Sequence, residues 1–101
     1  MESQGKYKFN QFKEELSQES FTEFFDYFFL RLSHFAKTIT NSEVLAEETV
    51  LDVFLKIWEQ RENLLVIQNI ETYLFVSIRN AAMNAIRKEQ KFSFEMLNDS
   101  H

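Results

Sequence analysis

The chain has 101 residues, of which 45% are apolar, and carries a net charge of −5. This length supports one domain with a single modest core, and the apolar content is well above that of disordered chains. The absence of cysteine excludes a disulfide framework and a thiolate metal site. No stretch reaches the eighteen uncharged apolar residues of a membrane span, and the polar residues 1–10 lack the apolar core of a signal peptide. We therefore expect a cytoplasmic protein.

Turn-forming residues are nearly absent. The chain has no proline, and its one glycine is Gly5. Sheets need frequent tight turns, which are usually built on glycine, asparagine or proline. The composition therefore predicts an all-α fold, with three long helices in an antiparallel bundle and a short N-terminal helix.

The N-terminal part predicts two helices. Residues 9–16 form a weakly amphipathic short helix. Ser20 is the expected N-cap of the first long helix, with Glu23 at the capping-box position. That helix runs to about Thr40, because apolar residues recur at three- and four-residue steps. Asn41 or Ser42 is expected to end it and to cap the next helix.

The C-terminal part predicts two more long helices. The second runs from about Ser42 to Gln60. Residues 61–69 follow as a loop, whose apolar residues 64–67 are expected to pack somewhere. Asn69 caps the third long helix, which runs to about Gln90. Residues 92–101 show no clear periodicity and are expected to be a linker or a disordered tail, which leaves residues 1–91 as the domain.

One stripe of the second long helix combines apolar and acidic side chains. Glu48, Leu51, Asp52 and Leu55 follow one another at i, i+3, i+4 and i+7, so they share a face. Apolar anchors beside acids are typical of a surface that docks a basic protein partner. The alternative is that both leucines simply widen the core face.

The third long helix has a polar face opposite its buried side. Tyr73, Ser77, Asn80, Asn84 and Arg87 lie on it. Asparagine is a poor helix former, so two of them in mid-helix need a reason. Amides and hydroxyls can read base edges, an arginine can bind phosphate, and an aromatic ring such as that of Tyr73 or Phe75 can stack on an unpaired base. The alternative is a solvated face whose basic end complements the helix C-terminus.

The sequence offers no converging catalytic groups. Its adjacent acidic pairs point about 100° apart on a helix, and a single glycine cannot build a phosphate-binding loop. No histidine is paired with a carboxylate at metal-ligand spacing. We therefore expect neither an enzyme nor a metal or cofactor site.

Three segments carry the patterns of a known family. They are Ala46-Glu-Glu-Thr-Val-Leu-Asp-Val-Phe-Leu-Lys-Ile-Trp58, Tyr73-Leu-Phe-Val-Ser-Ile-Arg-Asn80 and Phe24-Phe-Asp-Tyr-Phe-Phe-Leu-Arg-Leu-Ser-His-Phe-Ala36. They resemble segments of bacterial RNA polymerase sigma factors of the sigma-70 family, extracytoplasmic-function group. The first is similar to the segment that docks on core polymerase, the second to the segment that reads the −10 promoter element, and the third to the first helix of region 2. The three occur in the family's order and together cover residues 20–90.

The resemblance implies roles for the two surfaces. The stripe of Glu48, Leu51, Asp52 and Leu55 would meet the clamp helices of the polymerase's largest subunit. The other surface would bind the non-template strand of the −10 element, with residues 61–69 and Asn80 at a pocket for a flipped base. The implied DNA-binding set is Tyr73, Ser77, Arg79, Asn80, Asn84, Arg87 and Lys88. Arg79 has a second possible role, as an ion-pair partner within the bundle.

The resemblance also implies an anti-sigma factor as a further partner and a second domain, absent from this sequence, that reads the −35 element. Leu51 stands where the family commonly has glutamine, and Val76 stands where many relatives have a basic or polar residue. The alternative to a sigma factor domain is a helical interaction module that mimics or regulates such a domain. It would share the stripe at Leu51 and Asp52 but would not need the polar face at Asn80 and Asn84.

Overall fold

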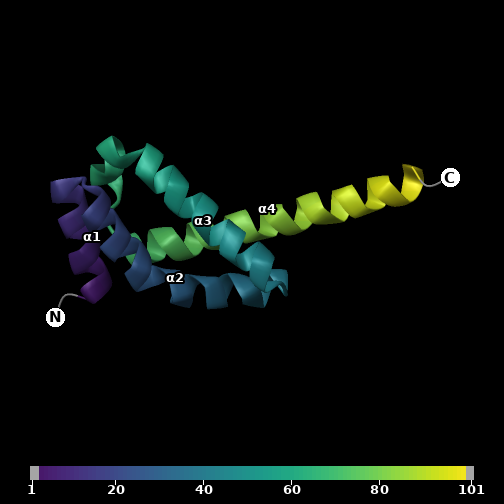
Figure 1. Ribbon diagram of the computed structural model, residues 1–101, viewed down its shortest axis with the longest axis horizontal. Helices are drawn as coiled ribbons and strands as arrows, with labels where there is room; N and C mark the ends of the chain where they lie inside the picture. Colours follow the sequence, from purple (N-terminus) through teal and green to yellow (C-terminus); the bar gives the residue numbers. More distant parts are fainter. Residues whose placement is uncertain (1–2, 100–101) are drawn as a thin grey trace.

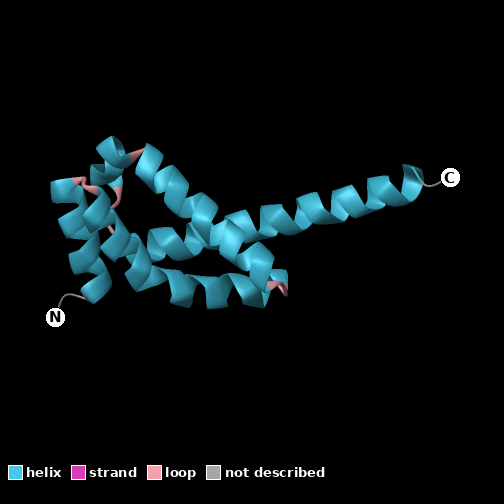
Figure 2. Ribbon diagram, in the orientation of Figure 1, coloured by secondary structure: helices cyan, strands magenta, loops and turns pink. Residues whose placement is uncertain are grey.

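The computed structural model describes residues 3–99, which fold into an all-α structure (Figures 1 and 2). The elements in chain order are α1 (Gln4–Glu15), α2 (Gln18–Thr40), α3 (Glu43–Glu59), the 3-10 helix η1 (Arg61–Val66) and α4 (Ile70–Asp99). Helices α2, α3 and α4 run antiparallel to one another in turn, and α1 lies across one end of them (Figure 1). The expected bundle of three long helices with a short leading helix is confirmed.

Capping side chains set the helix boundaries. Ser42 begins α3, since its hydroxyl accepts the amide of Leu45 at 3.1 Å. Asn41 ends α2 in the left-handed conformation that asparagine tolerates, with φ 56°. Asn69 begins α4, because its side-chain oxygen accepts the amide of Thr72 at 3.1 Å. These boundaries agree with the expectation from sequence.

The N-cap of α2 differs from that expectation. Ser17 is the N-cap, not Ser20, so the helix begins three residues earlier. The Ser20 amide donates to the Ser17 hydroxyl at 3.1 Å, and the Ser17 amide donates to the Ser20 hydroxyl at 3.3 Å. Ser20 thus supplies the second half of a capping box, the place usually taken by glutamate or glutamine, and is itself buried.

The core is rich in phenylalanine rings. Phe12 of α1 stacks on Phe24 of α2 with ring centroids 5.8 Å apart, and Phe24 contacts Phe54 of α3 at 5.2 Å. Leu74 and Ile78 complete this core from α4, and both are fully buried. The short helix α1 is therefore part of the core, and the aromatic contacts join it to α2 and α3.

The C-terminal half of the chain departs from expectation in two places. Of residues 64–67, which were expected to pack, Leu64 is buried and Ile67 is partly buried, but Leu65 and Val66 are almost fully exposed on η1. Helix α4 runs to Asp99, not to about Gln90, and its last turns project beyond the bundle (Figure 1). That segment lacks an apolar stripe facing the core, and therefore periodicity could not detect it.

Candidate functional site

The acidic and apolar stripe of α3 is exposed. Glu48 and Asp52 both face solvent, and the side chains of Leu51 and Leu55 are 49% and 54% exposed. Neither leucine belongs to the buried core, which α3 supplies mainly through Val50, Phe54 and Ile57. The structure therefore argues against the alternative that these leucines only widen the core face.

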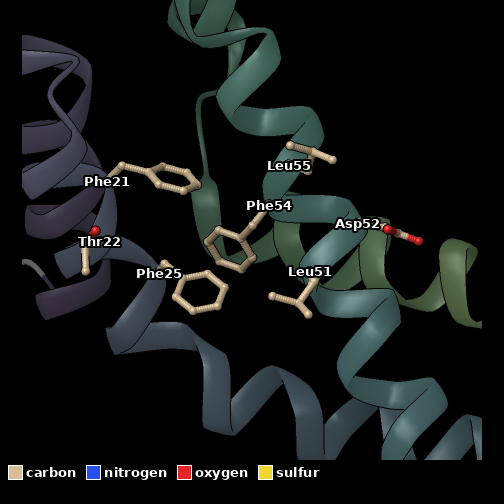
Figure 3. A pocket seen from close by; sticks show the side chains of 7 residues that line it. All are labelled: Phe21, Thr22, Phe25, Leu51, Asp52, Phe54 and Leu55. Carbon is tan, nitrogen blue, oxygen red and sulfur yellow. The ribbon is translucent and has the colours of Figure 1, made fainter.

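Beside this stripe lies an apolar groove between α2 and α3, with a volume of about 400 Å³ (Figure 3). Phe21 and Phe25 of α2 form one wall, and Leu51 and Leu55 form the other. Phe54 lies at its base and contacts Phe25 edge to face, with ring centroids 5.1 Å apart. Apolar side chains line most of this opening, which makes it an exposed apolar surface of the kind that binds other proteins.

The groove includes residues that sequence reasoning did not assign to a site. Phe21, Thr22 and Phe25 line it from α2. A signal for them exists in the sequence, because α2 carries more phenylalanines than one buried face can hold. The pairing of these residues with Leu51 and Leu55 depends on how α2 packs on α3, which periodicity does not reveal.

Asp52 stands on a ridge between two grooves. In Figure 3 its carboxylate points away from the phenylalanine rings, toward the side where α4 lies. A second, wider groove runs along that side between α3 and α4, and Glu48 and Asp52 line it together with Asn84 and Lys88. The two acids of the stripe therefore face α4, while its two leucines face α2.

The polar face of α4 gathers part of the expected DNA-binding set. One shallow depression is lined by Arg79, Asn80, Met83, Asn84 and Arg87. Arg87 donates to the side-chain oxygen of Asn84 at 3.0 Å, which holds the guanidinium beside the amide. Arg79 is exposed, and no ion pair involves it within residues 3–99.

The other members of that set lie elsewhere. Tyr73 is exposed one turn after the start of α4 and Ser77 is partly buried, and neither lines the depression. Lys88 lies in the groove between α3 and α4, on the same side as Asp52. Phe75 is not available for base stacking, because its ring packs edge to face on Phe35 at 4.9 Å and Arg31 covers it.

Within the part of the chain that the structure describes, no group of three or more histidine, cysteine or acidic side chains could hold a metal ion. None of the described helices is long and apolar enough to cross a membrane.

A family model described as Sigma-70 region 2 matches residues 24–92. The chain belongs to this family. Searches of curated proteins and of solved structures each found no significant match. The matched residues take in most of α2, all of α3 and η1, and α4 as far as Phe92.

Sigma-70 region 2 is a non-enzymatic transcription-factor domain, whose role in a sigma factor is to bind core RNA polymerase and promoter DNA. Both exposed surfaces described above, the stripe on α3 and the polar face of α4, fall within the matched residues. Helix α1 precedes them, although its rings contribute to the same core.

Proposed function

We propose that this domain, from a sigma factor of the extracytoplasmic-function group, docks on core RNA polymerase and recognises and melts the −10 promoter element. The observation that carries the proposal is the sigma-70 region 2 match over residues 24–92, which spans both exposed surfaces. The cytoplasm would be its place of action, with an anti-sigma factor as a further partner. Residues 92–101 would link it to a second domain that reads the −35 element.

Docking would use the stripe of α3. The clamp helices of the polymerase's largest subunit would pack on Leu51 and Leu55, while their basic side chains pair with Glu48 and Asp52. The exposure of both leucines supports this assignment, because the removal of apolar surface from water at the centre of an interface favours association. The acids would raise the association rate and select a basic partner.

Promoter recognition would use the other surface. Asn80 and residues 61–69 would form the pocket for a base flipped out of the non-template strand, and Tyr73 would stack on an unpaired base. Arg79 and Arg87 would bind phosphates of the DNA strand, and Ser77 and Asn84 would make further polar contacts to the same strand. The exposure of Asn80, Asn84 and Arg87 on one face supports this arrangement.

Melting would proceed by capture. Bases leave the duplex transiently, and a surface that binds only the unpaired strand shifts the equilibrium toward the open state. The domain needs no catalytic group for this step, because the free energy comes from the contacts made to the single strand. Lys88 could strengthen those contacts from the edge of the polar face, although in the structure it lies in the groove beside Asp52.

The proposal is tested by fluorescence anisotropy of the domain titrated with the isolated clamp-helix fragment of RNA polymerase. The wild-type domain should bind saturably. Asp52→Arg should weaken binding by roughly tenfold or more, because it replaces an attraction by a like-charge contact with a basic partner. Asp52 is exposed and makes no ion pair with another described residue, so the fold should be retained.

Glu14→Arg is the matched control, since it makes the same charge change on the exposed side of α1. It should bind like the wild type. If both variants lost binding equally, only the net charge would matter and the stripe would not be the docking site. A folded wild-type domain that failed to bind at low salt would contradict the proposal and favour the interaction-module alternative.

A further inference from the structure

The side chain of Arg61 is held in place where α3 meets η1. Its guanidinium lies over the ring of Trp58, 4.2 Å from the ring centroid, and donates a hydrogen bond to the Trp58 carbonyl oxygen at 2.8 Å. The ring is itself packed on the core, because Phe12 of α1 and Phe21 of α2 contact it with centroids 6.1 and 5.1 Å away. A cation is attracted to the face of an aromatic ring, most strongly to that of tryptophan. Arg61 therefore ties the first residue of η1 to the aromatic core.

The same hydrogen bond helps to end α3. The last four carbonyls of a helix have no amide partner within it, and the Trp58 carbonyl is one of these. Helices α1 and α2 end at residues in the left-handed conformation, Leu16 and Asn41, whereas Gln60 at the end of α3 has φ −102°. An arginine near the end of a helix can bond its last carbonyls and complement the helix dipole. The side chain of Arg61 takes this role at α3.

The rest of η1 has few other anchors. Hydrogen bonds of 3-10 helices have poor geometry, and the backbone of Asn63 leaves helical angles in the middle of the element, with φ −110° and ψ 17°. Among residues 61–66, all of which the structure describes, Leu64 is the one buried side chain. Arg61 and Leu64 therefore fix the position of η1 relative to α3.

We propose that Arg61 is a positioning residue for the base pocket at residues 61–69. It acts through Trp58 and η1 and does not touch the base. A pocket reads a base through the geometry of its contacts, and that geometry depends on how firmly the surrounding side chains hold the pocket. The use of the pocket rests on the function proposed above, but the link between Arg61, Trp58 and η1 does not.

Trp58 reports on the link directly, because it is the only tryptophan in the sequence. Arg61→Ala uncovers its ring, so quenching of its fluorescence by acrylamide should increase. The amides of Asn63 and Ile67, which donate to carbonyls at 2.8 and 3.1 Å, should exchange with deuterium about tenfold faster, the loss expected for one hydrogen bond and one cation–π contact. Lys13→Ala is the matched control, since Lys13 is also partly buried and lies 4.8 Å over the ring of Phe9. It should leave both measurements unchanged.

The role in recognition is tested with core polymerase and four promoter templates that differ only in the base at the flipped position of the −10 element. Fluorescence of 2-aminopurine elsewhere in that element measures opening. Arg61→Ala should reduce the ratio of opening between the preferred base and the other three by about tenfold. Arg61→Lys should restore part of the ratio, because it keeps a cation and a donor but not the planar guanidinium. Lys13→Ala should discriminate like the wild type.

The ratio separates positioning from a general structural role. A loss of folded protein or of polymerase docking lowers opening on all four templates alike and leaves their ratio unchanged. A phosphate contact by Arg61 would also affect all four equally, and its loss would lower the salt dependence of opening. If Arg61→Ala loses its helical circular dichroism, Arg61→Gln, which keeps a long side chain with a donor but no charge, replaces it.

Three results would overturn the inference. The first is unchanged quenching of Trp58 in Arg61→Ala, which would mean that the guanidinium does not cover the ring. The second is an Arg61→Ala chain that discriminates among the templates as well as the wild type. The third is an equal loss on all four templates. A wild type that opens none of them would instead contradict the proposed function, and the use of the pocket would fall with it.

Discussion

A single glycine fixes how closely α1 can approach α2. Gly5 is buried, and a Cβ atom at this position would collide with the ring of Phe28. In an exposed helix, alanine would be preferred to glycine by about 1 kcal/mol. Here packing opposes that preference, because the Phe28 ring is itself fully buried and has little room to move.

Gly5→Ala should therefore destabilise the domain by up to about 2 kcal/mol, the cost of overpacking less the gain in helix propensity. In a domain of this size, the melting temperature should fall by up to about 10 °C. Urea denaturation followed by circular dichroism measures the change. Gln4→Ala, on the exposed side of the same turn, is the control and should be neutral or slightly stabilising. A stabilised Gly5→Ala chain would mean that α1 does not pack on Phe28 as the structure shows.

At the scale of elements, the spacing of apolar residues predicted each helix that buries one of its faces in the core. Phe24, Phe28 and Leu32 of α2 and Leu74 and Ile78 of α4 recur at helical steps because each faces the core. Local signals also placed Asn41, Ser42 and Asn69 at helix ends.

The predicted N-cap of α2 was wrong because two overlapping sequence patterns are both compatible with a helix start in this segment. Ser20 with Glu23 has the usual capping-box residues, and the pair of Ser17 and Ser20 does not. In the structure Ser17 and Ser20 cap the helix reciprocally, and Ser20 is buried in its first turn.

The end of α4 gives a prediction at the same scale. The side chains of residues 92–97 are exposed and none of them belongs to the core, and a helical segment with little tertiary packing is marginally stable in water. Amide hydrogens of residues 92–97 should exchange orders of magnitude faster than those of residues 74–82, whose side of the helix is buried. Hydrogen–deuterium exchange at about 1 µM measures both segments in one experiment.

Residues 74–82 are the internal reference for this measurement. Equal protection of the two segments at 1 µM would contradict the view that the end of α4 lacks packing partners in the monomer.

For the molecule as a whole, the sequence predicted the stripe on α3 and the polar face of α4, but it did not predict the grooves that lie beside them. The stripe at Glu48 and Leu51 and the polar face at Asn80 follow from helical spacing within single helices. The groove beside Leu51, and the position of Lys88 next to Asp52, come from the packing of α3 against α2 and α4. Spacing along one helix carries no information about such packing between helices.

The separation of the two surfaces should make their functions separable. Asn80 is exposed on the α4 face and does not line either groove that borders α3. Asn80→Ala removes an amide that can hydrogen-bond a captured base, a contact worth about 1–3 kcal/mol, which corresponds to a loss of roughly five- to 150-fold in open complex. Binding to the clamp-helix fragment should be unchanged. Fluorescence of 2-aminopurine placed in the −10 element reports opening, and the anisotropy titration reports docking.

Glu14→Ala on α1, an exposed polar side chain outside both the polar face of α4 and the base pocket proposed at residues 61–69, is the control for a general loss of surface polarity and should open the promoter normally. If Asn80→Ala opened the promoter as well as the wild type, the base pocket would lie elsewhere on the domain. If it weakened docking and opening together, the polar face would act through the polymerase contact, and the division of labour between α3 and α4 would be wrong.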